Sequence, residues 1–166
     1  MGFSNITGIA DASFEQLVRD VHAIGRDVVR LHAAEVDRDA RFPKESMDAL
    51  RAAKLLSAYV PQEYGGMGLN IVQVAKLCEV LGQYCGATGM IYAMHKIQVA
   101  CVVHHAQQSE YFRGCLKQLV AEQRLMASAT TELGVGGDLR SSICAIEVSG
   151  DSFTLTKKAP VISYGE

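Results

Sequence analysis

Apolar positions recur at helical spacing through most of the chain up to residue 123. The first stripe begins just after Ser13, which forms the pattern of a capping box with Gln16. Its members are Phe14, Leu17, Val18, Val21, Val28 and Val29. Pro43 follows a break and is predicted at the first position of a second helix, where the missing N–H of proline costs nothing. Residues 11–123 are therefore predicted to form an all-helical bundle.

Three more helices are predicted after a glycine-rich loop at residues 61–70. Asn70 is a suitable N-cap for the first of them, and residues 82–87 break the pattern after it. Residues 88–106 form a long apolar segment, which we expect to be a helix buried on most sides. The last helix is predicted at residues 110–121. Its inward side chains are expected to be Tyr111, Leu116 and Leu119.

After Arg124 the pattern changes to short runs rich in β-branched residues. Strands are predicted at residues 126–130, 143–148, 153–156 and 161–163, with a turn at 149–151. The chain is thus predicted to be an α+β protein. A helical domain at 1–123 precedes 124–166, the first strands of a β-barrel-like domain. Because a few short strands leave open edges, a truncated longer protein is the favoured interpretation, and a complete small α+β protein is the alternative.

Composition and charge narrow the classes of function. A formal net charge of −2 without runs of like charge gives no reason to expect nucleic acid or an anionic membrane as partner. No apolar stretch is long enough to span a bilayer, and the start does not resemble a signal peptide, so a cytoplasmic protein is expected. The five cysteines are predicted to be buried free thiols, because no paired spacing occurs. No metal site is expected, since His104 and His105 are adjacent and, with His95, are predicted to face solvent or an interface.

Two motifs resemble the acyl-CoA dehydrogenase family. The first, FPKESMDALRAAKLLSAYVPQEYGGMGLN at residues 42–70, contains the family's Pro-Glu-x-Tyr-Gly-Gly-x-Gly loop between Pro61 and Gly68. The second, ASATTELGVGGDLRS at 127–141, is similar to the family's Thr-Glu-Pro-x-Ala-Gly-Ser-Asp turn. The resemblance covers nearly the whole chain from about residue 12. It implies the N-terminal helical domain and the start of the middle β domain of an FAD-dependent enzyme that dehydrogenates acyl thioesters.

The resemblance also implies a set of site residues. Glycines in the second motif let backbone N–H groups approach a ligand, and threonine hydroxyls can bond to the edge of a flavin. The FAD contacts are expected at Ser128, Thr130, Thr131, Gly136, Gly137, Val161, Ile162 and Ser163. Gly137 and Met94 are expected to bind substrate as well. The strand at 158–163 leaves its register open by one residue, and an ordinary β-turn is the alternative interpretation of the glycines.

Several functional expectations follow from the same resemblance. The catalytic base is expected beyond residue 166, and Glu132 is expected to be structural. The implied partners are acyl-CoA or a related thioester, an electron-transfer flavoprotein or similar acceptor, and further copies in a dimer or tetramer. The family's serine is replaced by Gly137, which favours the alternative of a flavin-dependent monooxygenase of the same fold. A non-catalytic helical interaction module is the third alternative.

Overall fold

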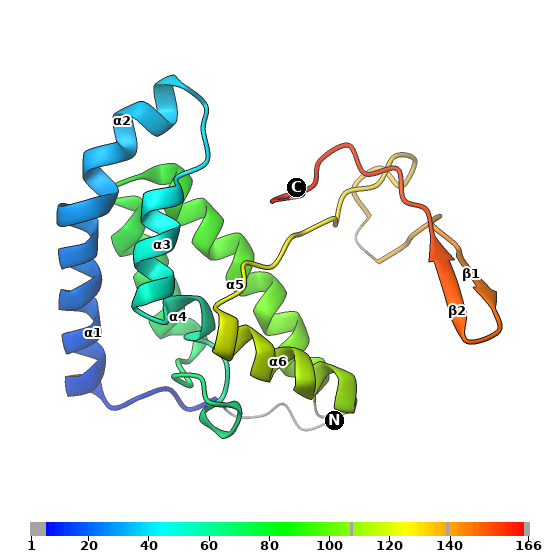
Figure 1. The fold of residues 1–166 in the computed structure, drawn as a ribbon, viewed down its shortest axis with the longest axis horizontal. Coiled ribbons are helices and arrows are strands. Elements are labelled where there is room, and N and C mark those ends of the chain that lie inside the picture. The colour runs from blue at the N-terminus through cyan, green and yellow to red at the C-terminus, as the bar shows by residue number, and fades with distance from the viewer. Residues whose placement is uncertain (1–5, 107, 139, 165–166) are drawn as a thin grey trace. The chain divides into compact units, whose positions relative to one another are not determined.

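The computed structural model of the protein describes residues 6–106, 108–138 and 140–164. The chain forms two compact units, Met1–Met126 and Ala127–Glu166. The first unit is helical, and the second contains a small antiparallel sheet (Figure 1). The helical elements are α1 (Asp11–Ile24), η1 (Gly25–Val29), α2 (Arg30–Arg38), α3 (Lys44–Ala52), η2 (Leu55–Ser57), η3 (Gln62–Tyr64), α4 (Ile71–Gly82), α5 (Gly86–Ala106) and α6 (Glu110–Glu122). The strands are β1 (Ile146–Ser149) and β2 (Ser152–Leu155). None of the described helices has the length and apolar character that crossing a bilayer requires.

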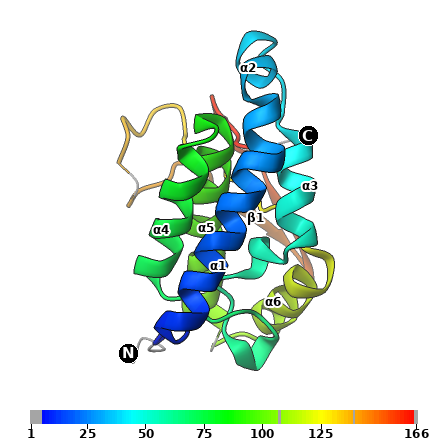
Figure 2. The ribbon, with the colours of Figure 1, turned by 90° about the vertical axis from the view of Figure 1, so that its left-hand side faces the viewer.

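Helices α1 and α2 form one continuous rod, joined by the π-helical turn η1. Figure 2 shows this rod in blue, with α3 and α4 on either side of it. The turn lies where Gly25 meets the ring of Tyr84, so closely that a Cβ at Gly25 would lie 2.2 Å from the ring carbon Cδ2. The Tyr84 hydroxyl is in turn 2.9 Å from Nδ1 of His22. A π turn adds one residue to the helix and shifts the side chains that follow.

The start of α1 differs from the prediction. Ser13 lies inside the first turn, and the N-cap is Ala10, which makes no side-chain hydrogen bond. A distant glutamine holds the preceding backbone instead: Gln73 Oε1 accepts from the N–H of Ile9 at 3.1 Å, and Gln73 Nε2 donates to its carbonyl at 2.8 Å. The predicted capping box at Ser13 is therefore wrong because a tertiary contact replaces the local one. Pro43 is the N-cap of α3, one residue before its predicted place.

The predicted cap at Asn70 is confirmed. Its side chain accepts from the N–H of Gln73 at 2.9 Å, and Gln73 Oε1 accepts from the N–H of Asn70 at 3.2 Å. These two bonds complete a capping box at the start of α4. Gln73 thus fixes both the start of its own helix and the segment before α1.

Burial in the helical unit follows the predicted stripes with some exceptions. Leu116 and Leu119 of α6 are buried as predicted, whereas Tyr111 is 75% exposed and lies edge-on against Phe112. Helix α5 is more exposed than expected. Its outward side chains include Met90, Ile97 and Cys101. All five cysteines are free, but only Cys85 is buried, so the expectation of buried thiols is wrong for the other four.

The sheet of the second unit is a two-stranded hairpin in the described residues. Strand β1 pairs with β2 across the predicted turn, in the register Ile146↔Leu155 and Val148↔Phe153. Paired positions share a face, so these four apolar side chains lie on one side of the hairpin, each more than half exposed. The predicted strands at 126–130 and 161–163 are not strands. They contribute only an isolated bridge between Ser128 and Ser163.

The close contact at η1 predicts opposite effects for two glycine substitutions. Gly25→Ala should destabilise the helical unit by about 1–3 kcal/mol, because the new methyl group must displace the Tyr84 ring. Gly114→Ala is the matched control. Gly114 is an exposed position inside α6, where a Cβ would meet nothing within 4 Å, so alanine should add about 0.5–1 kcal/mol of stability. Urea unfolding measures both; equal effects would contradict the packing at η1.

Candidate functional site

Two segments of the second unit, residues 128–133 and 158–163, run antiparallel to each other. Ser128 and Ser163 exchange main-chain hydrogen bonds of 3.1 and 2.9 Å. Further along, the N–H of Leu133 donates to the carbonyl of Lys158 at 3.0 Å. This pairing brings together most of the residues that the sequence predicts to bind a flavin. It also sets the register of the last segment, with Ser163 opposite Ser128.

Between these two contacts a side chain interrupts the ladder. In a regular antiparallel pair, the next hydrogen-bonded position would join the N–H of Thr130 to the carbonyl of Val161. Here the hydroxyl of Thr131 donates to that carbonyl at 2.8 Å. Among the described residues, the N–H of Thr130 has no hydrogen-bond acceptor. The interruption explains why these segments do not form the predicted strands.

Hydroxyl groups gather at the interruption. The side-chain oxygens of Ser128 and Thr130 are 3.0 Å apart, and Ser128 is buried while Thr130 and Thr131 are exposed. Lys157 lies beside them, with Nζ 3.5 Å from the Thr130 carbonyl and 3.7 Å from Oε2 of Glu132. The polar edge formed by Ser128, Thr130 and Thr131 thus offers acceptors, a main-chain donor and a nearby positive charge.

The glycine-rich turn that follows is held by two carboxylates. Glu132 accepts from the Ser142 hydroxyl at 2.9 Å and from the Ile143 N–H at 3.1 Å, and its side chain is almost fully buried. The backbone N–H of Arg140, assisted by Ser141, lowers the pKa of Asp138. Both acids therefore shape the turn. Gly134, Gly136 and Gly137 all have positive φ, between 58° and 99°, so the turn itself favours glycine at each position whatever ligand it meets.

The remaining predicted site residues belong to three different segments of the chain. Val161 and Ile162 are exposed in the segment opposite the polar edge. Gly136 and Gly137 lie in the turn and are also exposed. Met94 belongs to the helical unit, where it is half-buried on α5. The binding role of each of these residues stays a prediction.

Sequence reasoning missed a buried polar cluster on α5, formed by Tyr92, His95 and Lys96. Their side chains meet the carbonyls of Leu55 and Leu56 in η2. The expectation that His95 faces solvent or an interface is wrong, because its side chain is fully buried. One signal in the sequence could have found this cluster: the spacing i, i+3, i+4 places all three residues on one face of a helix.

Burial controls the protonation of this cluster. It lowers the pKa of His95 to about 3, with a smaller contribution from the charge of Lys96. It also lowers the pKa of Lys96 well below the usual value, and it raises the pKa of the nearby thiol of Cys78. His95 is consequently neutral across the physiological range.

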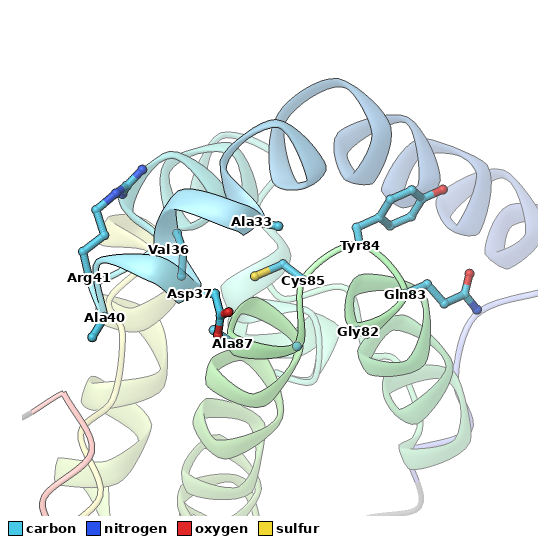
Figure 3. A pocket seen from close by; sticks show the side chains of 11 residues that line it. Ala33, Val36, Asp37, Ala40, Arg41, Gly82, Gln83, Tyr84, Cys85 and Ala87 are labelled. Atoms are coloured by element: carbon cyan, nitrogen blue, oxygen red, sulfur yellow. The ribbon is translucent and has the colours of Figure 1, made fainter.

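The helical unit also contains a cavity of about 600 Å³ beside the end of α2 and the 82–87 loop (Figure 3). The Cys85 sulfur and the Asp37 carboxylate lie at its centre in this view. Arg41 lines it too, but its guanidinium is bound by Glu35 at 2.9 Å and Glu45 at 2.9 Å. No predicted site residue lines this cavity, and within the described ranges no cluster of three metal-ligating side chains occurs. The polar edge remains the better candidate site.

Comparison with known proteins decides the family. Residues 11–123 match the acyl-CoA dehydrogenase N-terminal domain. The chain belongs to this family. Over 140 residues it is 29% identical to a probable acyl-CoA dehydrogenase, fadE25, of Mycobacterium leprae, covering 84% of this chain and 36% of that protein. Over 152 residues it is 26% identical to the short-chain specific acyl-CoA dehydrogenase of Clostridium acetobutylicum, covering 91% and 40%. The chain thus spans only 36% and 40% of the length of these two relatives.

Solved structures agree with the fold. FMN-bound TdsC from Paenibacillus sp. A11-2 superposes with a TM-score of 0.71 at 18% identity, over 84% of this chain and 34% of that one. A structure described as the electron transferring flavoprotein of Acidaminococcus fermentans gives the same TM-score at 19% identity, covering 93% and 40%. The predicted fold class, an α+β chain with a helical N-terminal domain of acyl-CoA dehydrogenase type, is confirmed. In the described residues, the expected start of a β-barrel-like domain is a two-stranded antiparallel sheet.

The buried state of His95 predicts a dependence of stability on pH. The unfolded imidazole takes up a proton below its ordinary pKa of about 6.5, whereas the folded one resists protonation down to about 3. The contribution of neutral His95 is therefore complete above about pH 6.5 and falls with decreasing pH, by at most about 1.4 kcal/mol per unit. Urea unfolding of the parent and of His95→Asn between pH 7 and 4 measures it. The variant should show the shallower dependence, and parallel curves would contradict a neutral buried ring.

Proposed function

We propose that this chain is the N-terminal part of an FAD-dependent enzyme that dehydrogenates acyl thioesters. The family membership of residues 11–123 and the relatives named above as acyl-CoA dehydrogenases support this proposal. The observation that carries it is the polar edge. The Thr131 hydroxyl donates to the carbonyl of Val161, so the N–H of Thr130 can donate to a ligand instead. A flavin, when bound, supplies the hydride-accepting chemistry of such a reaction.

The groups at the polar edge fit the rim of a flavin ring, which carries both carbonyl oxygens and an N–H. The Thr130 N–H is a donor for a ring carbonyl. The hydroxyl of Thr131 donates its hydrogen bond to the carbonyl of Val161, so its lone pairs can accept from a ring N–H. Val161 and Ile162 add exposed apolar surface from the opposite segment. Ser128, Thr130, Thr131, Val161, Ile162 and Ser163 are thus the proposed cofactor-binding residues, with Gly136 and Gly137 in the turn.

Fewer observations support the proposed substrate-binding residues. Gly137 and Met94 are the candidates, and the position of Gly137 is open, since a Cβ there would meet nothing within 4 Å. Its positive φ of 86° nevertheless disfavours a larger residue. The absence of a side chain at this position favours, as a second candidate, a flavin-dependent monooxygenase of the same fold. Bleaching of the bound flavin by acyl-CoA without oxygen consumption distinguishes a dehydrogenase from a monooxygenase. A preparation that never binds flavin would instead point to the non-catalytic interaction module.

The proposed reaction needs partners that this chain does not supply. Its general base is expected outside residues 1–166, and its electrons are proposed to pass to an electron-transfer flavoprotein or a similar acceptor. Assembly into a dimer or tetramer is proposed for the whole protein, as is its place in the cytoplasm.

Residues 1–166 alone are expected to show little or no dehydrogenase turnover. Loss of the general base reduces rate by a factor of about 10²–10⁴, and incomplete enclosure of the flavin reduces it further. Reduction of an electron-accepting dye with acyl-CoA measures the turnover. Robust activity of this chain by itself would place the base within it and contradict the assignment.

Thr131→Val tests the placement of the flavin in the natural protein. The loss of one hydroxyl bond should lower flavin affinity roughly two- to twelve-fold, because such a bond contributes about 0.5–1.5 kcal/mol. Thr131→Ser keeps the hydroxyl and should keep the affinity. The matched control is Thr154→Val, which makes the same substitution at an exposed position of β2. Fluorescence titration with FAD measures all three, and equal affinity of Thr131→Val and Thr154→Val would contradict the placement.

A further inference from the structure

Lys157 is held beside the polar edge by contacts within the second unit. Its Nζ is 3.5 Å from the carbonyl oxygen of Thr130 and 3.7 Å from Oε2 of Glu132. The side chain of Lys157 is only 25% exposed. The next residue, Lys158, is exposed, and its side chain forms no hydrogen bond or ion pair with the described residues. Of two consecutive lysines, one therefore lies at the polar edge and the other in solvent.

Glu132 supplies the counter-charge of Lys157 and is itself fixed by two other donors. Its Oε1 accepts from the N–H of Ile143 at 3.1 Å, and its Oε2 accepts from the Ser142 hydroxyl at 2.9 Å. Both donors belong to the segment that follows the glycine-rich turn. The carboxylate is thus tied to that segment, while the ammonium group contacts both the carboxylate and the Thr130 carbonyl. These contacts keep the positive charge of Lys157 at the polar edge.

The carbonyl that Lys157 contacts belongs to the same residue as the N–H proposed to bind the flavin. In a regular antiparallel pair, the N–H and the carbonyl of one residue point to the same side, toward the partner strand. At Thr130 the N–H has no acceptor among the described residues, and the carbonyl has Lys157 beside it. A ligand bound to this N–H therefore lies close to the ammonium group. Under the proposed function, that ligand is a carbonyl oxygen at the rim of the flavin ring.

A cation at this place distinguishes the reduced flavin from the oxidised one. A hydride taken from a substrate brings two electrons and one proton to a neutral ring, so the ring carries a negative charge unless a second proton follows. The oxidised ring has no net charge. A nearby ammonium group therefore interacts much more strongly with the reduced ring than with the oxidised ring.

We propose that Lys157 sets the reduction potential of the proposed flavin site by stabilising the negative charge of the reduced ring, and that Glu132 holds it in position. The inference rests on the proposed function, because it assigns a purpose to a charge beside the proposed cofactor-binding residues. It gives Lys157 a role different from that of Thr131, whose hydroxyl acts on the binding of the ring in either state.

The two neighbouring lysines provide a matched test in the natural protein loaded with FAD. Lys157→Met removes the charge and keeps an unbranched apolar side chain, and Lys158→Met makes the same change at the exposed neighbour. Sulfite is the probe, because this anion adds to an oxidised flavin and leaves the ring negatively charged. Titration followed by flavin absorbance should give a sulfite Kd roughly ten-fold higher for Lys157→Met. Lys158→Met and the charge-preserving Lys157→Arg should bind sulfite as the natural protein does.

Glu132→Gln tests the sign of the effect. The amide oxygen can still accept from Ile143, but the negative charge beside Lys157 is gone. Sulfite should therefore bind more tightly to this variant, and the reduction potential of its flavin, measured against a reference dye, should rise. The potential should fall in Lys157→Met. If Lys157→Met does not fold, Glu132→Gln decides: tighter sulfite binding supports the inference, and unchanged or weaker binding overturns it.

The affinity for oxidised FAD separates an electrostatic role from a structural one. Because the oxidised ring is neutral, Lys157→Met should bind FAD within about two-fold of the natural protein. Weaker binding of oxidised FAD without a change in sulfite binding would make Lys157 structural and overturn the inference. Equal sulfite binding by Lys157→Met and Lys158→Met would overturn it too. A natural protein that binds no FAD would instead refute the proposed function, and the inference with it.

Discussion

The carbonyls of Leu55 and Leu56 are the constraint around which the helical unit is organised. Both residues are buried in the turn η2, and a buried carbonyl without a donor costs about 1–3 kcal/mol. A single face of α5 supplies the donors, four hydrogen bonds from Tyr92, His95 and Lys96. These bonds therefore fix the position of η2, the turn after α3, relative to the middle of α5. They also fix the positions of the side chains that pack on either element.

Lys96 is the unusual member of this arrangement. Its side chain is only 4% exposed, and among the described residues it forms no ion pair with an acid. Two carbonyl oxygens and the face of the Tyr92 ring, 4.6 Å from Nζ, surround the amine instead. These contacts favour the ammonium form, while burial acts against it and lowers the pKa. Each carbonyl keeps a second donor, so the cluster does not depend on the charge of Lys96.

The sequence predicted those elements whose signals are local. The capping box of Asn70 and Gln73 needs residues only three apart, and the hairpin of β1 and β2 needs only two β-branched runs and a glycine turn. Predictions failed where a distant group intervened. Ser13 is not a cap because Gln73 holds Ile9, and His95 is buried because η2 presents carbonyls from about forty residues away. Spacing along the chain carries no information on such partners.

The predicted strands at 126–130 and 161–163 also fail because of a group outside the local pattern, and this failure bears on the proposed function. Residues 128–131 and 161–163 have the composition of paired strands, and the bridge at Ser128 and Ser163 shows that the pairing begins. The pairing stops because the hydroxyl of Thr131 donates to the carbonyl of Val161, which the next pair of the ladder would use. A continuous strand would use its donors in the ladder. In the interrupted one, no described residue bonds to the Thr130 N–H or to the lone pairs of Thr131. An interrupted pairing of this kind suits a binding site, because a ligand can form hydrogen bonds only with groups that have no partner within the fold.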